Sequence, residues 1–433
     1  MVGARGLAKR ALVALHKDPH TRLRDQLERG GLHGRELAFA YELAHGVVRR
    51  ERLIDSILEG VVHRALPSGP ALKVVLRLGV YQLLFLPGMP SHAAVHETVG
   101  LVRQNRGFAN ALLRRVAGMI CDVPADPARP RDELPLDEHR SFRVPRSLPE
   151  DEVERSAVLH SVPEWLARRI TDQHGPAGFA QVAEAASAKP TVYLRSRGPA
   201  DALAAELQAE GVEVDARQGS DLLAWTGGGS PFDTGVFRRG AFVAQDPTAV
   251  AAARALPCSR GDRVIDLCAA PGTKTTLLAD RVGSTGKVYA YDPDDGRRQR
   301  IVENVERTRL SDVVEVVADK RSLRPADGVL ADVPCSNTGV LGRRVEVRGR
   351  LAASIFEGLC QLQGQILREA IELARPGGHV VYSTCSIDDE ENHGVVDEVV
   401  AERPDVTLLE SCLTLPRQGR HDGGYFAVLR RSG

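Results

Sequence analysis

The C-terminal part of the chain alternates between two hydrophobic patterns. From Asp262 onward, short apolar runs typical of buried strands are separated by longer stretches with helical spacing. This rhythm predicts an α/β fold with a mostly parallel sheet and helices packed on its faces. The predicted strands are Arg263–Asp266, Lys287–Tyr291, Val313–Val317, Gly328–Ala331 and His379–Ser383.

Several of these predicted strands end in, or next to, a residue that can do chemistry. The residues are Asp266, Asp292, Asp332 and Cys385. Ligands of open α/β sheets bind outside the carboxyl ends of the strands. We therefore expect these side chains to gather at one edge of the sheet and to form the functional site.

The N-terminal part of the chain reads as all-α. Apolar residues recur at the spacing of one helical face in several segments, namely Ala71–Leu86, Leu37–Leu58 and Phe108–Val116. The pattern predicts a bundle of helices with short breaks over residues 1–120.

The middle of the chain divides into two further parts. Residues 121–150 are rich in proline and charged residues and poor in aliphatic ones, which predicts a linker. Residues 151–240 predict a small α+β module that positions the substrate, and residues 241–433 form the α/β domain. The predicted elements of the module are a helix at Val162–His174, a strand at Thr191–Arg195, a helix at Pro199–Glu210 and a strand at Val212–Val214.

The net charge of zero conceals an asymmetry along the chain. Residues 1–120 carry 18 Lys and Arg against 9 Asp and Glu, so the remainder is acidic by the same amount. A basic helical module joined to an acidic one indicates a partner that is a polyanion such as RNA. A solvated helical surface in an arginine-rich protein explains the charge equally well, so charge alone leaves both interpretations open.

Apolar runs and cysteine spacing exclude several classes of protein. No run reaches the roughly 18 apolar residues of a membrane span, and the N-terminus lacks the apolar core of a signal peptide. The seven cysteines form no C-x-x-C pair and no Cys/His cluster with zinc spacing. We expect a cytoplasmic monomer with no disulfide framework and no metal site.

A turn of small residues follows the first predicted strand and precedes a helix. It runs through Cys268, Ala269, Ala270, Pro271, Gly272, Thr273 and Lys274. Small residues let a ligand approach the backbone amides closely. The full G-x-G-x-x-G spacing of dinucleotide sites is absent, which favours an adenosyl cofactor without phosphates. Asp292 is placed to accept ribose hydroxyls and Asp319 to border the adenine; the alternative is a helix cap with two surface acids.

Two short cysteine motifs lie downstream of this turn. They are Asp332-Val333-Pro334-Cys335 and Ser383-Thr384-Cys385-Ser386. Methyl transfer to carbon 5 of cytosine needs a thiolate that adds at carbon 6 and makes carbon 5 nucleophilic. Lys274 can lower the pKa of such a thiol, and Asp332 can donate to ring nitrogen 3 if burial raises its pKa. Transfer to an exocyclic amine is less favoured, because a thiol at position 335 cannot stack on a base.

At these motifs the sequence resembles the NOL/NOP/Sun family of RNA cytosine-5 methyltransferases. The turn is similar to the family's Cys-Ala-Ala-Pro-Gly-Gly-Lys-Thr, and the cysteine motifs resemble its Asp-x-Pro-Cys-Ser-x-x-Gly and Ser-Thr-Cys-Ser. The N-terminal bundle is similar to the NusB RNA-binding domain through Leu76–Leu84 and Asn110–Arg115. That combination looks like the bacterial enzymes that methylate 16S ribosomal RNA.

The resemblance implies a Rossmann-like methyltransferase domain and assigns roles to its residues. Cys385 would be the covalent nucleophile, Cys335 would assist product release, and Lys274 and Asp332 would act beside them. S-adenosylmethionine would be the cofactor, bound by residues 268–274 with Asp292, Asp319 and Asp332.

The chain departs from the family pattern at a few positions. Thr273 replaces the second glycine of the turn, Val345 and Gly349 replace a proline and a tryptophan, and Ser196-Arg197 replace valine and asparagine. The same chemistry on transfer RNA remains an alternative. A non-catalytic RNA-binding scaffold is the alternative of another class, and it would be favoured by the loss of a thiol or of Asp332, all of which are present.

Overall fold

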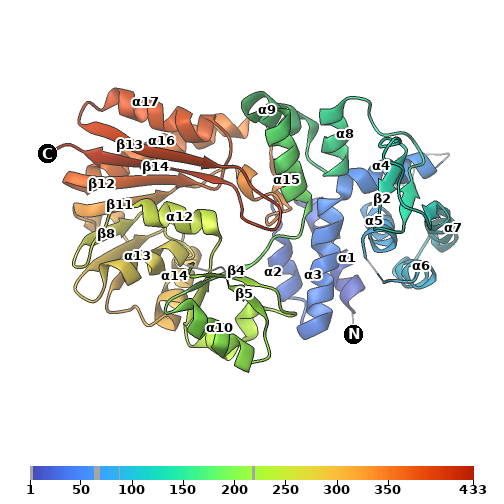
Figure 1. Cartoon of the computed structure of the whole chain (residues 1–433), viewed down its shortest axis with the longest axis horizontal. Coiled ribbons are helices and arrows are strands. Elements are labelled where there is room, and N and C mark those ends of the chain that lie inside the picture. Colours follow the sequence, from blue (N-terminus) through green and yellow to red (C-terminus); the bar gives the residue numbers. More distant parts are fainter. Residues whose placement is uncertain (1–2, 63–68, 87, 217–219) are drawn as a thin grey trace. The chain divides into compact units, whose positions relative to one another are not determined.

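The computed structural model describes residues 3–62, 69–86, 88–216 and 220–433 (Figure 1). The described residues fall into two compact units. The helical unit comprises the chain up to Ala188 together with Leu341–Leu351, and the sheet unit comprises Lys189–Val340 and Ala352–Gly433. Each unit is described by itself.

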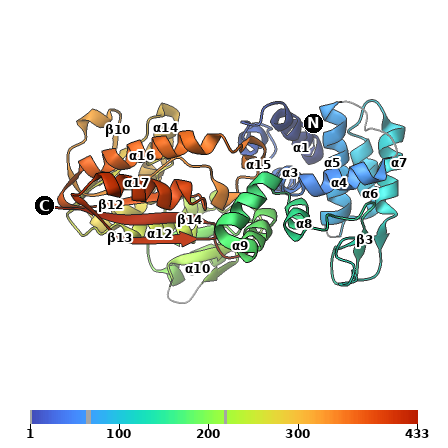
Figure 2. The same cartoon turned by 90° about the horizontal axis from the view of Figure 1, so that it is seen from above.

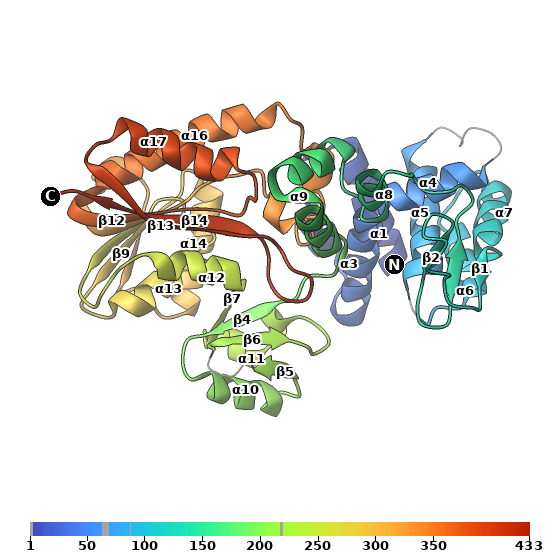
Figure 3. The same ribbon diagram turned by 45° about the horizontal axis from the view of Figure 1, so that its top comes forward.

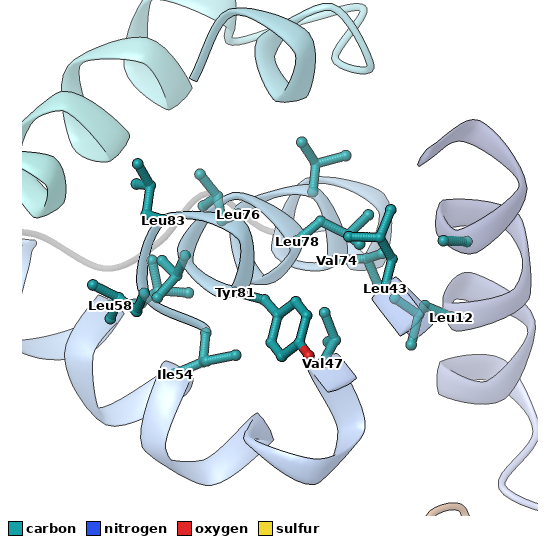
Figure 4. Packing of buried hydrophobic residues seen from close by; sticks show 14 of the residues in the cluster. Leu12, Leu43, Val47, Ile54, Leu58, Val74, Leu76, Leu78, Tyr81 and Leu83 are labelled. Carbon is teal, nitrogen blue, oxygen red and sulfur yellow. The ribbon is translucent and has the colours of Figure 1, made fainter. Parts of the chain in front are cut away.

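The helical unit is built around helix α5 (Pro70–Phe85), which is buried without interruption from Val74 to Leu84. Proline at its first position and long apolar side chains suit this central place. Figure 4 shows labelled side chains of α5 and of its neighbours turned toward one another. The surrounding helices are α1 (Ala4–Lys17), α2 (Leu23–Glu28), α3 (Gly34–Arg49), α4 (Glu51–Val61), α6 (Ser91–Val99) and α7 (Arg106–Ala117).

The predicted helical bundle is confirmed, with one difference in its helices. The periodic segment Leu37–Leu58 is split at Arg50, whose backbone leaves the helical region with φ −118° and ψ 13°. Two helices, α3 and α4, therefore replace one, and both present buried faces to α5.

Residues 121–150, which the sequence predicts as a linker, contain a small antiparallel sheet. Its strands are β1 (Ile120–Cys121), β2 (Glu133–Pro135) and β3 (Ser141–Arg143), in the order β1-β3-β2. Leu134 and Phe142 are buried and join the core of the helical unit. Strands this short show no alternation that a sequence pattern can detect.

Helices α8 (Glu152–Leu159) and α9 (Glu164–Ser187) complete the helical unit. The chain bends inside α9 at Gly175, which has φ 72° and precedes Pro176. The compact boundary therefore falls after Ala188, whereas the sequence places the start of the α+β module at residue 151.

The sheet unit contains an open sheet with strand order β10-β9-β8-β11-β12-β14-β13. Strands β10, β9, β8, β11 and β12 run parallel to one another. Strand β14 pairs antiparallel with β12 and with β13. Figure 2 shows β10 and β13 at opposite edges. The strands are β8 (Arg263–Asp266), β9 (Lys287–Tyr291), β10 (Val314–Val317), β11 (Ala326–Asp332), β12 (Ala374–Thr384), β13 (Val406–Thr414) and β14 (Gly424–Arg431).

Helices cover both faces of this sheet (Figure 3). The predicted α/β fold with a mostly parallel sheet is therefore confirmed. Each predicted strand corresponds to an observed one, and β13 and β14 are additional. On one face lie α16 (Ile355–Leu373) and α17 (Val395–Glu402), and on the other α12 (Pro247–Ala255), α13 (Thr273–Val282) and α14 (Asp295–Arg307).

A second, smaller antiparallel sheet precedes the large one within the sheet unit. Arg195 and Arg197 of this part both pair with Asp280 on α13, at N–O distances of 3.2 and 2.7 Å. These ion pairs attach the small sheet to the helix that follows the predicted cofactor turn. Its order is β5-β6-β4-β7, and its elements are β4 (Tyr193–Ser196), α10 (Ala200–Ala209), β5 (Val214–Ala216), β6 (Leu222–Trp225), α11 (Gly235–Arg238) and β7 (Phe242–Ala244).

Candidate active site

The carboxyl ends of four adjacent parallel strands bring the predicted residues to one edge of the sheet. Asp266 is the last residue of β8, Asp292 follows β9, Asp332 ends β11, and Cys385 follows β12. These strands lie in the order β9-β8-β11-β12. Parallel strands of one sheet end at a common edge, which is why positions far apart in sequence meet here.

The predicted cofactor turn is held by its own backbone and by the neighbouring strand. The Gly272 amide donates to the Ala269 carbonyl at 2.6 Å, and the Ala269 amide donates to the Tyr291 carbonyl at 2.9 Å. Gly272 has φ 98° and caps α13, and a Cβ there would lie 3.3 Å from Ile301. Only glycine fits this conformation and this approach without strain.

Asp292 closes the turn from the side of β9. Its side chain is 1% exposed and pairs with Arg297 at 3.2 Å. One carboxylate oxygen accepts a hydrogen bond from the Ala270 amide at 3.3 Å. The carboxylate of the second strand is thus tied to the backbone of the turn after the first.

Asp266 offers an acceptor that the chain leaves unused. Its Oδ2 accepts a hydrogen bond from Thr275 at 2.7 Å, whereas its Oδ1 is buried and has no partner among the residues described. Burial, opposed by the Thr275 hydrogen bond and reinforced by the charge of Asp332, raises the pKa of Asp266 to about 7. A cofactor that carries an ammonium group and hydroxyls fits this donor-poor position.

Lys274 and Asp332 form an ion pair at the centre of the strand ends. Lys274 Nζ lies 2.6 Å from Asp332 Oδ2, and Ser383 donates to Asp332 Oδ1 at 2.8 Å. Burial lowers the pKa of Lys274, but Asp332 and then Cys385 raise it by more, so the net direction is upward. Lys274 is therefore a cation that both Asp332 and Cys385 stabilise.

The two predicted thiols are in direct contact. Cys335 Sγ and Cys385 Sγ lie 3.1 Å apart, and the Cys385 thiol donates to Asn337 Oδ1 at 3.3 Å. Asn337 adopts a left-handed backbone with φ 63°, a conformation that asparagine tolerates better than most residues. The hydrogen bond with Cys385, followed by burial, raises the pKa of Cys335 well above its ordinary value. The Cys335 thiol therefore keeps its proton.

The remaining predicted residues lie less centrally. Cys268 lies in the turn, and burial raises its pKa, with Asp266 adding to the effect, so it behaves as a small neutral side chain. Asp319 caps the short helical turn Lys320–Ser322 and is about half exposed, and its carboxylate pairs with Arg321 at 2.7 Å. This pairing lowers the pKa of Asp319 to about 2. In this structure Asp319 serves its own turn.

A buried glutamate, which is not among the residues predicted from the sequence, completes the site. Glu391 is 0% exposed and accepts hydrogen bonds from the residues that follow each cysteine, Ser336 and Ser386. It lies in the acidic stretch Asp388–Glu391, which in sequence resembles a solvated surface. Its place five residues after Ser386, the last residue of Ser-Thr-Cys-Ser, is the signal that points to a role at the site.

Among the described residues, no helix is both long enough and apolar enough to cross a bilayer. The same residues contain no group of three or more His, Cys, Asp or Glu side chains arranged to hold a metal ion.

Comparison with known proteins assigns both parts of the chain. Residues 253–426 match the model of the 16S rRNA methyltransferase RsmB/F family, and residues 3–118 match the NusB family. A Mycobacterium tuberculosis protein named as a methyltransferase is 33% identical over 87% of this chain and 81% of its own. The ribosomal RNA small subunit methyltransferase B of Sodalis glossinidius is 30% identical over 91% of this chain and 90% of its own.

Solved structures share the fold. The crystal structure of PH0851 covers 99% of this chain and 98% of that chain with a TM-score of 0.76 and 23% identity. NSun6 from Pyrococcus horikoshii, solved with the S-adenosylmethionine analogue SFG, covers 63% of this chain and 98% of its own with a TM-score of 0.57 and 20% identity. The chain therefore belongs to the RsmB/F family of S-adenosylmethionine-dependent RNA methyltransferases and carries an N-terminal NusB-family domain.

Proposed function

We propose that this protein transfers a methyl group from S-adenosylmethionine to carbon 5 of a cytosine in 16S ribosomal RNA, through a covalent bond between Cys385 and carbon 6. The contact of two thiols at 3.1 Å, beside the Lys274–Asp332 ion pair, carries the proposal. A thiol that attacks and a second thiol within reach of it are what addition and release at carbon 6 require.

Cys385 begins the reaction. Its thiolate adds to carbon 6, and the electron pair of the 5,6 double bond makes carbon 5 nucleophilic. The cation of Lys274 favours the thiolate form of Cys385, since the two groups interact. Asp332 is held by Lys274 and Ser383 at the end of the neighbouring strand, so the Lys274–Asp332 ion pair is fixed at the same edge of the sheet as Cys385.

The turn at the end of β8 would hold the cofactor. The backbone of Cys268 to Thr273 would receive it, Asp292 would accept from its ribose hydroxyls and Asp319 would border its adenine. The buried Asp266 Oδ1, which has no partner among the described residues, would accept from its ammonium or hydroxyl groups. Bound there, S-adenosylmethionine supplies an electrophilic methyl group.

Cys335 acts when the product leaves. The carbon 5 proton passes to solvent, its electron pair restores the 5,6 double bond, and the sulfur–carbon pair returns to Cys385. The protonated thiol of Cys335, 3.1 Å from Cys385 Sγ, stabilises the returning negative charge. The raised pKa of Cys335 supports this division of roles, because it keeps the proton available.

The family and the N-terminal domain favour ribosomal RNA, and hence the cytoplasm, as the place of action. Bisulfite sequencing of ribosomal and transfer RNA, from cells with and without the protein, tests the substrate. A protected cytosine in 16S ribosomal RNA that depends on Cys385 is expected. Protection in transfer RNA alone would move the same chemistry to that substrate, and unchanged RNA would favour the scaffold.

A further inference from the structure

We infer that Glu391 is a positioning residue that fixes the two catalytic thiols in one arrangement and keeps their roles distinct. The inference rests on the proposed roles of Cys385 and Cys335, but it is tested through thiol chemistry that needs no methyl transfer. Glu391 belongs to the turn Glu390–Gly394 between β12 and α17, whose π-helical winding is often found at functional sites.

The Glu391 carboxylate joins the two cysteine loops. Its Oε1 accepts from the Ser336 amide at 2.8 Å, and its Oε2 accepts from the Ser386 hydroxyl at 2.5 Å and from the Ser336 hydroxyl. Ser336 follows Cys335 after β11, and Ser386 follows Cys385 after β12. A single side chain thus holds the residue that follows each cysteine. If either loop moves, it loses its hydrogen bond to Glu391, the residue that also holds the other loop.

Glu391 is itself held rigidly. Gln363 of α16 donates to its Oε1 at 2.8 Å, and Tyr382 of β12 donates to its backbone carbonyl at 2.5 Å. The next residue, Asn392, binds Thr384 at 2.6 Å and the Ser386 carbonyl at 3.1 Å. Positions on both sides of Cys385 are therefore fixed from the same turn.

The burial of Glu391 is costly by ordinary criteria. The side chain is fully buried, and the hydrogen-bond donors described around its carboxylate are all neutral. A buried carboxylate whose hydrogen-bond donors are all neutral costs more free energy than a neutral group of the same shape. Structures keep such a group where it serves a site, and here it directly borders the reactive thiols.

The charge of Glu391 also separates the two thiols. It raises the pKa of Cys335, after the larger effects of the Cys385 hydrogen bond and burial, whereas Lys274 interacts favourably with Cys385. Cys335 therefore faces an anion and Cys385 a cation. Among the described residues, the titratable groups that act on the pair include Lys274 of α13, Tyr382 of β12 and Glu391 itself, and Asp332 of β11 is paired with Lys274.

The substitution Glu391→Gln removes the charge and preserves the shape. The amide oxygen can accept from Ser336 and Gln363, and the amide nitrogen can donate to the serine hydroxyls. The pH midpoint of Cys335 alkylation by iodoacetamide, followed by mass spectrometry in a Cys385→Ser background, should fall by about one unit. Glu390→Gln, the exposed neighbour in the same turn, is the matched control and should leave the midpoint in place.

A second set of variants tests the anchoring without touching the glutamate. Ser336→Ala and Ser386→Ala each remove one hydroxyl donor from one loop. Each should lower kcat up to about 100-fold, while KM for S-adenosylmethionine stays close to the parent value.

An unchanged Cys335 midpoint in folded Glu391→Gln, or an equal shift in Glu390→Gln, would overturn the electrostatic role. Serine variants with full kcat would overturn the anchoring role. If Glu391→Gln fails to fold, the serine variants still decide the matter. If the unsubstituted protein shows no methyl transfer, that result counts against the proposed function. It leaves the inference about Glu391 in place, because the alkylation experiment does not depend on methyl transfer.

Discussion

Each unit of the protein buries a charged side chain, and the two are used differently. In the sheet unit, Glu391 gathers donors from the loops that carry the thiols. In the helical unit, Arg348 on α15 (Val347–Arg350) is 6% exposed and donates to the backbone carbonyls of Arg49, His160 and Ser161. It also reaches the carbonyls of Ala186 and Leu341.

The hydrogen-bond partners of Arg348 and of Glu391 show how their roles differ. Arg348 binds carbonyls where helices end, so it holds together segments of one core, and burial lowers its pKa to about 9. Glu391 binds the neighbours of reactive groups. A buried charge costs free energy in both places, but of the two side chains it is Glu391 that lies next to the proposed reactive thiols. Substitutions at the thiols should therefore change activity, and substitutions at Arg348 should change stability.

Cys385→Ala should have the largest effect on this comparison. Removal of the nucleophile should lower methyl transfer by about 10⁴-fold or more, because Cys385 is the thiol that interacts with Lys274. S-adenosylmethionine binding measured by calorimetry and the thermal midpoint should stay close to the parent values. Cys412→Ala, an exposed cysteine on β13, is the control. Full activity in Cys385→Ala would refute the covalent mechanism.

Cys335→Ala should block the later stage of the same reaction. Without its thiol the adduct with Cys385 should persist, and a protein–RNA band that resists denaturant should appear on gels after incubation with S-adenosylmethionine. The double variant with Cys385→Ala should show no band. Absence of the band in the single variant would mean that another group releases the product.

Arg348→Ala should remove the hydrogen bonds that hold segments of the helical unit together. It leaves the carbonyls that Arg348 now binds without a donor, which should lower the free energy of unfolding by about 3 kcal/mol, as measured by urea denaturation. Arg350→Ala on the same short helix, with a half-buried side chain, should cost less than about 1 kcal/mol. An equal loss of unfolding free energy in both variants would show that Arg348 does not hold these segments together.

Asp266→Asn should have the smallest effect and depends on pH. The folded-state pKa of about 7 lies above the ordinary carboxyl value of 3.8, so the folded state holds this proton more tightly. Parent stability should therefore fall as pH rises from about 4 to 7 and then level off. Asparagine cannot ionise, so the variant should gain about 2.5 kcal/mol on the parent between pH 5 and pH 8. Parallel pH profiles of the thermal midpoint would contradict the assignment.

Periodicity explains what could be predicted. The strands ending at Asp266 and Asp332 are runs of buried residues with turns at both ends, and α5 carries its apolar residues at one-face spacing. These signals are local, so a single sequence contains them. The strands β2 and β3 are only three residues long, and their burial depends on the helices that they cover, which no local pattern describes.

The residues that we propose to react could be chosen from the amino-acid sequence alone, because their chemistry resides in side-chain type and in position after a strand. Cys385, Cys335, Lys274 and Asp332 are recognisable in that way. The contacts of Glu391 with the residues that follow both cysteines, and the place of Leu341–Leu351 in the helical unit, become visible in the fold. An acidic residue or an arginine reads as solvated until its neighbours are known, since burial and hydrogen bonding come from contacts across the fold.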